Sequence, residues 1–180
     1  MHFCGCKISP WIIEWIARID DAYIAERNQP NRKTLLGQNI LLVGAGAIGG
    51  YLADLLVRSG AGLGNGKFTI IDPDDLKPGN IGRHRLGMES LGQLKSMALV
   101  KQILMSFPSA NIEGLTVDVR QYDLADFHLI INATGEQTIS DYLSTTLNHG
   151  AFIPNIHVWI EGPGAAVSHQ ARWVFKISYH

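Results

Sequence analysis

An amide, a guanidinium and an ammonium group follow one another in the middle of the chain as Asn80, Arg83 and Lys95. Negative charge spreads over phosphate oxygens when a phosphate ester reacts, and preorganised cations stabilise that charge in a partly dehydrated site. Asn80 could donate a hydrogen bond to the same oxygens. Taken singly, Arg83 and Lys95 are better explained as solvated surface cations, and we expect both to be partly solvent-facing. As an ordered set, the three residues predict chemistry on a phosphate.

A glycine-rich loop precedes this set. It reads Gly44-Ala45-Gly46-Ala47-Ile48-Gly49. An apolar strand is predicted before it, at residues 39–43, and a helix after it, at 48–58. Such a loop turns the backbone tightly and offers the N–H groups of a helix N-terminus to a pyrophosphate or triphosphate. The candidate nucleotide-binding residues of the loop are therefore Gly44, Ala45, Gly46 and Gly49.

Two carboxylates follow the second predicted strand, residues 67–71. Asp72 ends that strand, 23 positions after Gly49. A carboxylate at this place can accept hydrogen bonds from both ribose hydroxyls of an adenosine. Asp74 is a further candidate for nucleotide binding. A strand-end turn would explain Asp74 and Asp75 equally well.

The rest of the chain alternates strands with helices. A polar loop at 73–92 is longer than usual connections in such folds. Helices are predicted at 94–105 and 136–148, and strands at 111–117, 128–133, 151–156 and 157–168, the last two broken by a turn at 161–164. This order predicts an α/β fold: a Rossmann-like, mostly parallel sheet with helices on both faces and a C-terminal hairpin.

The N-terminal region predicts an amphipathic helix over residues 9–27, with Trp11, Trp15 and Tyr23 on its apolar face. We accordingly divide the chain into an N-terminal helix and connector, residues 1–35, and one nucleotide-binding domain, residues 36–180. His2, Cys4 and Cys6 suggest a zinc site, but a structural zinc site normally has a fourth ligand. A frayed terminus is the simpler explanation.

Bulk composition excludes several classes of function. The 180 residues carry a formal charge of −1 with no basic stripe, so nucleic-acid binding is not expected. No apolar run reaches the ~18 residues that span a bilayer, and no signal peptide is apparent, so no membrane association is expected. We expect a cytoplasmic protein.

The motifs occur in an order that resembles the ThiF, MoeB and HesA family, which includes the adenylation domains of ubiquitin-activating enzymes. The matching residues are Gly44, Gly46, Gly49, Asp72, Asn80-x-x-Arg83 and Gly92-x-x-Lys95. The resemblance covers residues 36–168, and Pro78-Gly79-Asn80-x-x-Arg83-His84 is similar to bacterial members. Several separated motifs in the right order make coincidence improbable.

This resemblance implies an ATP- and magnesium-dependent adenylyltransferase. The C-terminal carboxylate of a ubiquitin-like or sulfur-carrier protein would attack the α-phosphate of ATP and release pyrophosphate. Asn80, Arg83 and Lys95 would be the catalytic residues. A homodimer is also expected, with the helix at 9–27 as one candidate contact.

Two departures from the family pattern bear on this expectation. The family usually has an Asp where Gly135 stands, and that carboxylate is associated with magnesium and triphosphate. Glu136 could replace it, although an acidic residue is also favoured in the first turn of a helix. The chain ends soon after the hairpin, where the family domain normally continues, and neither Cys4 nor Cys6 matches the family's acyl-accepting cysteine.

Two other functions stay open. An NAD(P)-binding oxidoreductase would use the same glycine loop and Asp72, but it leaves Asn80, Arg83 and Lys95 unexplained. A catalytically impaired module that binds a nucleotide or a ubiquitin-like protein would fit Gly135 and the short C-terminal part.

Overall fold

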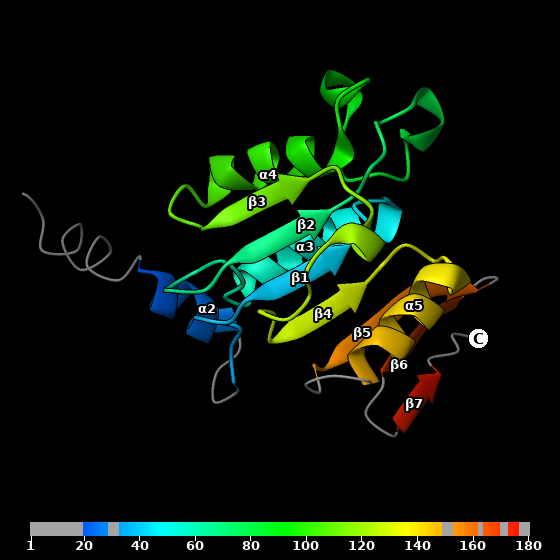
Figure 1. Ribbon diagram of the computed structural model, residues 1–180. Coiled ribbons are helices and arrows are strands. Elements are labelled where there is room, and N and C mark those ends of the chain that lie inside the picture. Colours follow the sequence, from blue (N-terminus) through cyan, green and yellow to red (C-terminus); the bar gives the residue numbers. More distant parts are fainter. Residues whose placement is uncertain (1–19, 29–32, 149–152, 162–163, 170–172, 177–180) are drawn as a thin grey trace, which may run out of the picture.

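A sheet with the strand order β3-β2-β1-β4-β5-β6-β7 forms the centre of the computed structural model (Figure 1). The structure describes residues 20–28, 33–148, 153–161, 164–169 and 173–176. The strands are β1 (Ile40–Val43), β2 (Phe68–Ile71), β3 (Ile112–Leu115), β4 (Leu129–Asn132), β5 (Asn155–Glu161), β6 (Gly164–His169) and β7 (Trp173–Lys176). The strands from β3 to β5 pair in parallel, whereas β6 pairs antiparallel with β5 and with β7.

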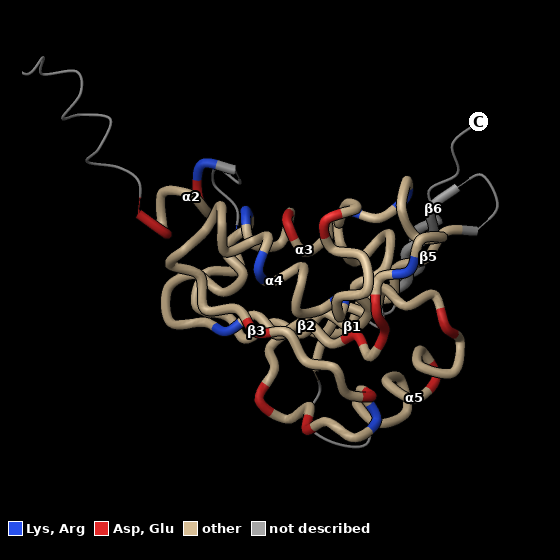
Figure 2. Tube along the Cα trace, turned by 90° about the horizontal axis from the view of Figure 1, so that it is seen from above, with Lys and Arg blue, Asp and Glu red and all other residues tan. Residues whose placement is uncertain are grey.

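The described α-helices are α2 (Asp21–Asn28), α3 (Ala47–Arg58), α4 (Lys95–Ser106) and α5 (Gln137–Asn148). Helix α3 connects β1 to β2, α4 leads into β3, and α5 connects β4 to β5. Short 3₁₀ turns are η1 (Pro78–Asn80), η2 (Met88–Ser90) and η3 (Val119–Gln121). Figure 2 shows α3 and α4 on one side of the sheet and α5 on the other.

The central strands are apolar runs because both of their faces are covered. All four residues of β1 and of β2 are buried. Side chains that alternate along β1 enter two different cores, with Ile40 and Leu42 in the core under α3 and α4 and Leu41 and Val43 in the core under α5. The alternation of side chains along β1 thus matches the placement of α3 and α4 on one face of the sheet and of α5 on the other.

The parallel Rossmann-like sheet confirms the prediction from the sequence, but one strand boundary was wrong. Strand β5 runs through the expected break between residues 156 and 157, because Ile156 and His157 both pair with β4. The long loop at 73–92 contains η1 and η2 and is tied to the start of α4 by a bridge between Asp75 and Leu94. Of the helix expected at 9–27, α2 is the described part, and the remainder lies outside the described residues.

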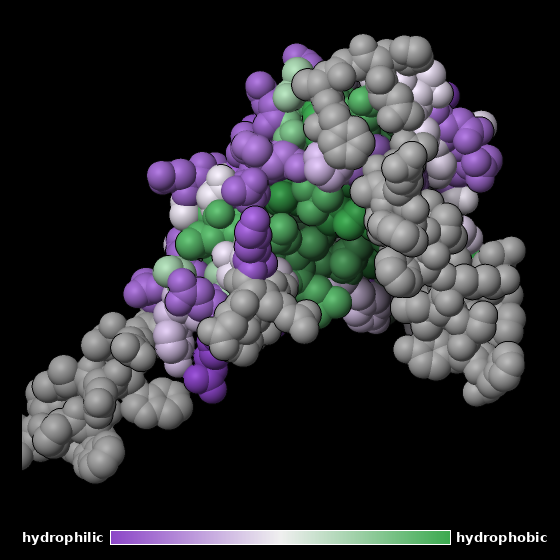
Figure 3. All heavy atoms as spheres, turned by 90° about the horizontal axis from the view of Figure 1, so that it is seen from below, coloured by the Kyte–Doolittle hydropathy of each residue, from purple (hydrophilic) through white to green (hydrophobic). Residues whose placement is uncertain are grey.

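The surface mixes charged and apolar regions. Figure 2 shows acidic and basic residues distributed over the whole trace, in keeping with the lack of a basic stripe in the sequence. Figure 3 shows a broad apolar area in the middle of one face. Exposed large apolar side chains include Leu55 on α3 and Ile160 on β5. No helix in the described part of the chain is long and apolar enough to cross a membrane.

Candidate nucleotide-binding site

The chain changes direction across the sheet between β1 and β4: β2 and β3 lie to one side of this pair and β5 to the other. Ligands of open parallel sheets bind at such a switch point, beyond the carboxyl ends of the strands. A cavity of about 350 Å³ lies there. Its lining residues are Val43, Gly44, Gly46, Ile71, Asp72, Pro73, Asp74, Lys95, Val117, Asp118, Val119, Arg120, Ala133, Thr134, Glu136 and Ile139.

The glycine-rich loop forms one wall of this cavity and leads into α3. Gly44 has a φ of +94°, and a Cβ there would lie 2.9 Å from the backbone nitrogen of Thr134. A Cβ at Gly49 would lie 1.8 Å from the carbonyl oxygen of Gly44. Glycine is therefore required for the close approach of the loop to α3 and to the end of β4. Gly46, the N-cap of α3, has open space around its Cα.

Asp72, only 6% exposed, fastens this loop to the end of β2. Its Oδ2 accepts a hydrogen bond from the Ala45 N–H at 2.7 Å, and its Oδ1 accepts one from the Asp74 N–H at 2.9 Å. A carboxylate has about four lone-pair sites, so Asp72 can still accept from a ribose hydroxyl. Asp72 lines the cavity, and it also has a structural role that the sequence did not indicate.

Lys95 begins α4 and lines the cavity. Its Nζ donates to Asp74 Oδ2 at 2.8 Å. This hydrogen bond to Lys95 lowers the pKa of the Asp74 carboxyl below its usual range. Lys95 is buried, so the expectation that it would be partly solvent-facing was wrong. The Asp74 carboxylate gives the buried ammonium group a hydrogen-bonded partner of opposite charge.

Asn80 and Arg83 do not line the cavity in this structure, although the sequence groups them with Lys95. The Asn80 Oδ1 accepts a hydrogen bond from the Lys77 N–H at 2.9 Å, which holds the 3₁₀ turn η1 closed. Arg83 is exposed, and it makes no salt bridge with any carboxylate in the described ranges. Its guanidinium is therefore available to a bound anion.

Arg120 and Asp118 also line the cavity, from the segment after β3, and were not among the residues predicted from the sequence. The Arg120 guanidinium donates to both Asp118 oxygens, and this lowers the pKa of the Asp118 carboxyl to about 2. Their position directly after a predicted strand could have identified them, since the carboxyl ends of neighbouring parallel strands meet at one edge of the sheet.

Glu136 brings a further carboxylate to this cavity. Gly135 lines a second cavity beside it. The described lining holds four carboxylates, from Asp72, Asp74, Asp118 and Glu136, against the cations of Lys95 and Arg120. A polyanionic nucleotide would enter such a site with a divalent cation, which oxygen ligands suit. Carboxylates fit a magnesium ion that also holds phosphates, although no cluster of three metal-ligating side chains occurs among the described residues.

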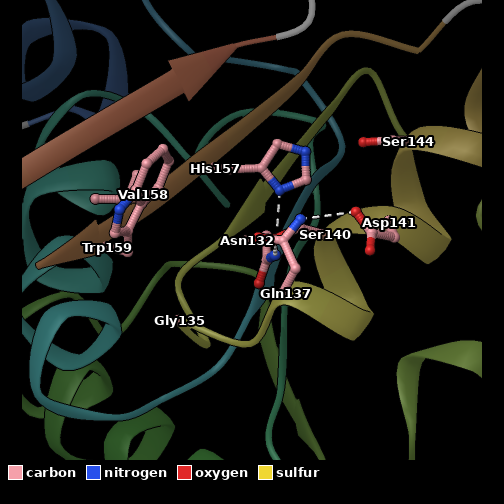
Figure 4. Close-up of a pocket in the computed structure, with 9 residues that line it drawn as sticks. All are labelled: Asn132, Gly135, Gln137, Ser140, Asp141, Ser144, His157, Val158 and Trp159. Atoms are coloured by element: carbon pink, nitrogen blue, oxygen red, sulfur yellow. Dashed lines mark hydrogen bonds between the residues drawn. The ribbon is translucent and has the colours of Figure 1, made fainter. Parts of the chain in front are cut away.

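The neighbouring cavity, of about 320 Å³, lies between α5 and β5 (Figure 4). Asn132 and His157 point toward each other there, with 3.2 Å between Asn132 Nδ2 and His157 Nδ1. Asn132 also donates to Ser140 Oγ at 3.0 Å. Burial lowers the pKa of His157, so the ring is held neutral. The loop between β4 and α5 separates the two cavities.

A parallel sheet with a glycine loop, a buried lysine and a carboxylate-rich cavity at its switch point defines the class of Rossmann-like nucleotide-binding domains. Within that class the chain belongs to the ThiF family, whose family model matches residues 21–149. This confirms the family resemblance seen in the motifs.

The chain is similar to proteins named ATP-dependent ubiquitin transferase-like protein Cap2. It is 48% identical over 163 residues to that of Pseudomonas aeruginosa, covering 91% of this chain and 29% of the relative. It is 36% identical over 162 residues to that of Vibrio cholerae, covering 84% of this chain and 27% of the relative. The chain therefore spans less than a third of the length of these relatives.

Among solved structures, the chain is similar to Escherichia coli MccB in a crystal structure with AMPCPP and MccA. The TM-score is 0.62 at 16% sequence identity, and the match covers 73% of this chain and 40% of that chain. At this identity, the likeness shows that the two proteins share a fold.

Proposed function

We propose that this chain adenylates the C-terminal carboxylate of a ubiquitin-like or sulfur-carrier protein. A carboxylate oxygen attacks the α-phosphorus of ATP, the bond from that phosphorus to the bridging oxygen of the β-phosphate breaks, and pyrophosphate leaves. The products are an acyl-adenylate and pyrophosphate. Membership of the ThiF family and similarity to proteins named ATP-dependent ubiquitin transferase-like support this proposal.

The observation that carries the proposal is the buried ammonium group of Lys95. It lines the same cavity as Gly44 and Gly46, beside the N-terminus of α3. A cation held in a partly dehydrated cavity stabilises charge on phosphate oxygens far better than one in water. A dehydrogenase does not need such a group for its chemical step, since hydride transfer builds no charge on the phosphates.

Arg83 and Asn80 are proposed to complete the site when ATP binds. Arg83 is exposed and follows η1, so its side chain is free to turn toward a phosphate. Asn80 would keep its oxygen on the Lys77 N–H and offer its amide N–H groups to the nucleotide. Magnesium, bound by the phosphates and by Glu136 or Asp74, would neutralise part of the triphosphate charge.

We also propose a homodimer. Leu55 on α3 and Ile160 on β5 are exposed by 59% and 61%. They lie on the same side of the sheet, because Ile160 shares the face of Val158, which packs against the core that contains α3. A second copy covering such a face would remove apolar surface from water. Light scattering that shows only monomer at all concentrations would remove this part of the proposal.

Exchange of labelled pyrophosphate into ATP tests the proposed reaction. The chain should catalyse exchange only when ATP, magnesium and a ubiquitin-like protein with a free C-terminus are all present. Titration with NADH, followed by its fluorescence, tests the dehydrogenase alternative. ATP binding without exchange would instead favour a module that binds nucleotide and partner but does not adenylate.

A further inference from the structure

His84 contacts the glycine-rich loop directly, although it lies 39 positions away in the sequence. Its Nε2 is 2.7 Å from the carbonyl oxygen of Ala45, and its Nδ1 accepts a hydrogen bond from the Leu86 N–H at 3.0 Å. Because Nδ1 accepts, the proton of the neutral ring is on Nε2 and is donated to Ala45. The ring is only 7% exposed, and its burial lowers the pKa of His84.

Ala45 is thus held at both of its backbone groups. Its N–H donates to Asp72 Oδ2 at 2.7 Å, and its carbonyl accepts from His84. Both partners are buried, so these bonds are protected from competition with water. Two side chains from different segments therefore fix the peptide planes on either side of Ala45.

The segment that carries His84 also packs against the first turn of α3. A Cβ at Gly50 would lie 3.0 Å from the Cβ of Arg85 and 3.7 Å from Cε1 of His84. Arg85 bonds to Asp54, one turn further along α3, at 3.4 Å. Arg83 lies immediately before this anchored stretch, so the same contacts fix the backbone from which the Arg83 side chain extends.

We propose that His84 is a positioning residue that sets the geometry of the phosphate-binding loop and of Arg83 together. It would not touch the nucleotide. The Nε2–H of His84 orients the Ala45 peptide, and hence the N–H groups that follow Ala45 at the start of α3. The backbone of His84 also positions Arg83, the residue before it. The inference rests on the proposed nucleotide site, but the hydrogen bond itself exists without nucleotide.

Two substitutions separate the functions of the ring nitrogens. In His84→Gln, the amide nitrogen can occupy the place of Nε2 and donate to Ala45. In His84→Asn, the shorter side chain reaches only the place of Nδ1, so it can accept from Leu86 but cannot reach Ala45. Both variants lack an ionisable ring, and both are polar, so they differ mainly in the bond to the loop.

Hydrogen exchange of the loop amides, measured by NMR without nucleotide, tests the positioning directly. We expect His84→Asn to speed exchange at the hydrogen-bonded N–H groups of Ala45 and Gly50 by about tenfold and His84→Gln to restore most of the protection. Affinity for AMPCPP with magnesium should fall in parallel, by about tenfold in His84→Asn and little in His84→Gln. Unchanged loop exchange in a folded His84→Asn variant would overturn the inference.

Failure of the proposed function would give a different combination of binding and hydrogen-exchange results. If the wild-type chain did not bind AMPCPP, the nucleotide proposal would fail while the exchange measurements would still report on the loop. Equal losses of protection throughout α3, α4 and α5 in both variants would show a general loss of packing and would also overturn the positioning role. Circular dichroism and melting temperature establish whether each variant is folded.

Discussion

The ammonium group of Lys95 lies 2.8 Å from the carboxylate of Asp74, and the exposed fractions of these side chains are 9% and 61%. The pair therefore joins a buried cation to a carboxylate at the rim of the cavity. An incoming phosphate would compete with Asp74 for the same ammonium group. Since Asp74 is exposed, water can solvate it when the lysine turns to a phosphate.

Lys95→Met tests the buried cation while keeping a long apolar stem. We expect pyrophosphate exchange to fall at least about 100-fold, because the charge on the reacting phosphate loses its partner. The melting temperature should change little, since Asp74 remains solvated. As the companion variant, Asp74→Asn leaves the cation in place, so it should retain exchange when magnesium is saturating. Exchange at the wild-type rate in Lys95→Met would exclude Lys95 from the reaction.

Arg83→Ala should abolish exchange without affecting the fold. The side chain is exposed, and substitutions of this kind usually alter the free energy of unfolding by less than about 0.5 kcal/mol. Lys101→Ala is the matched control, since Lys101 is an exposed cation of α4 that does not line the cavity. Equal rates of exchange in the two variants would show that Arg83 is only a surface residue.

Two glycines of one loop should respond differently to alanine. Gly49→Ala places a Cβ 1.8 Å from the Gly44 carbonyl oxygen, so the loop and α3 must move apart. We expect a loss of about 2 kcal/mol or more in the free energy of unfolding, measured by urea denaturation. Gly46→Ala meets no atom within 4 Å and should fold normally.

The Gly46→Ala variant also separates folding from binding. Gly46 lines the cavity, so an added methyl group would take space there. AMPCPP affinity should fall while urea stability stays near that of the wild type. Stability losses of equal size in Gly46→Ala and Gly49→Ala would contradict the close approach described for Gly49.

The stability of the fold should decrease in mild acid because of two buried neutral histidines. The pKa values of His84 and His157 are lowered from 6.5, in both cases chiefly because burial disfavours the charged ring. As the pH falls below about 6.5, the unfolded chain binds protons before the folded chain does, so the free energy of unfolding decreases.

Urea titrations at several pH values between 7.5 and 5 measure this effect. We expect a decrease of about 1 kcal/mol or more over that range. The lowered pKa values of Asp74 and Asp118 act only in stronger acid, so this window isolates the histidines. His84→Gln should show a shallower decrease, and a pH-independent wild type would refute the assignment of neutral rings.

Glu136→Gln tests the expected metal ligand. Glu136 lines the cavity from the end of the loop, immediately before α5, so the loss of its charge should raise the magnesium concentration needed for half-maximal exchange. Removal of magnesium with EDTA should stop exchange in the wild type. If the two proteins needed the same magnesium concentration, Glu136 would not be a ligand, and Asp74 would be the next carboxylate to substitute.

Patterns of local chemistry made much of the fold predictable. The apolar run 39–43 and the glycines after it could only be a buried strand followed by a tight turn, and β1 with its loop is found there. Strand order and the bond from Ala45 to Asp72 join segments far apart in the sequence. Periodicity carries no information about such contacts.

The site was predictable in its residue types but not in its contacts. One cavity is lined by Gly44, Gly46, Asp72, Asp74 and Lys95, five of the residues singled out from the sequence. Burial of Lys95 could not be read from a sequence in which single lysines are usually solvated. The contact of His84 with the Ala45 carbonyl could not be predicted either, because a hydrogen bond to a backbone carbonyl has no sequence motif.

The position of β1 between β2 and β4 has a consequence for how the chain folds. Asn39, the residue before β1, donates its backbone N–H to the Nδ1 of His128, 89 residues later. During synthesis the central strand must therefore wait for β4 with one side unpaired. Parallel pairings of such high contact order form slowly. Until then, the exposed edge of β1 is open to association with other nascent chains, so the yield of folded protein should depend on the rate of translation through residues 40–132.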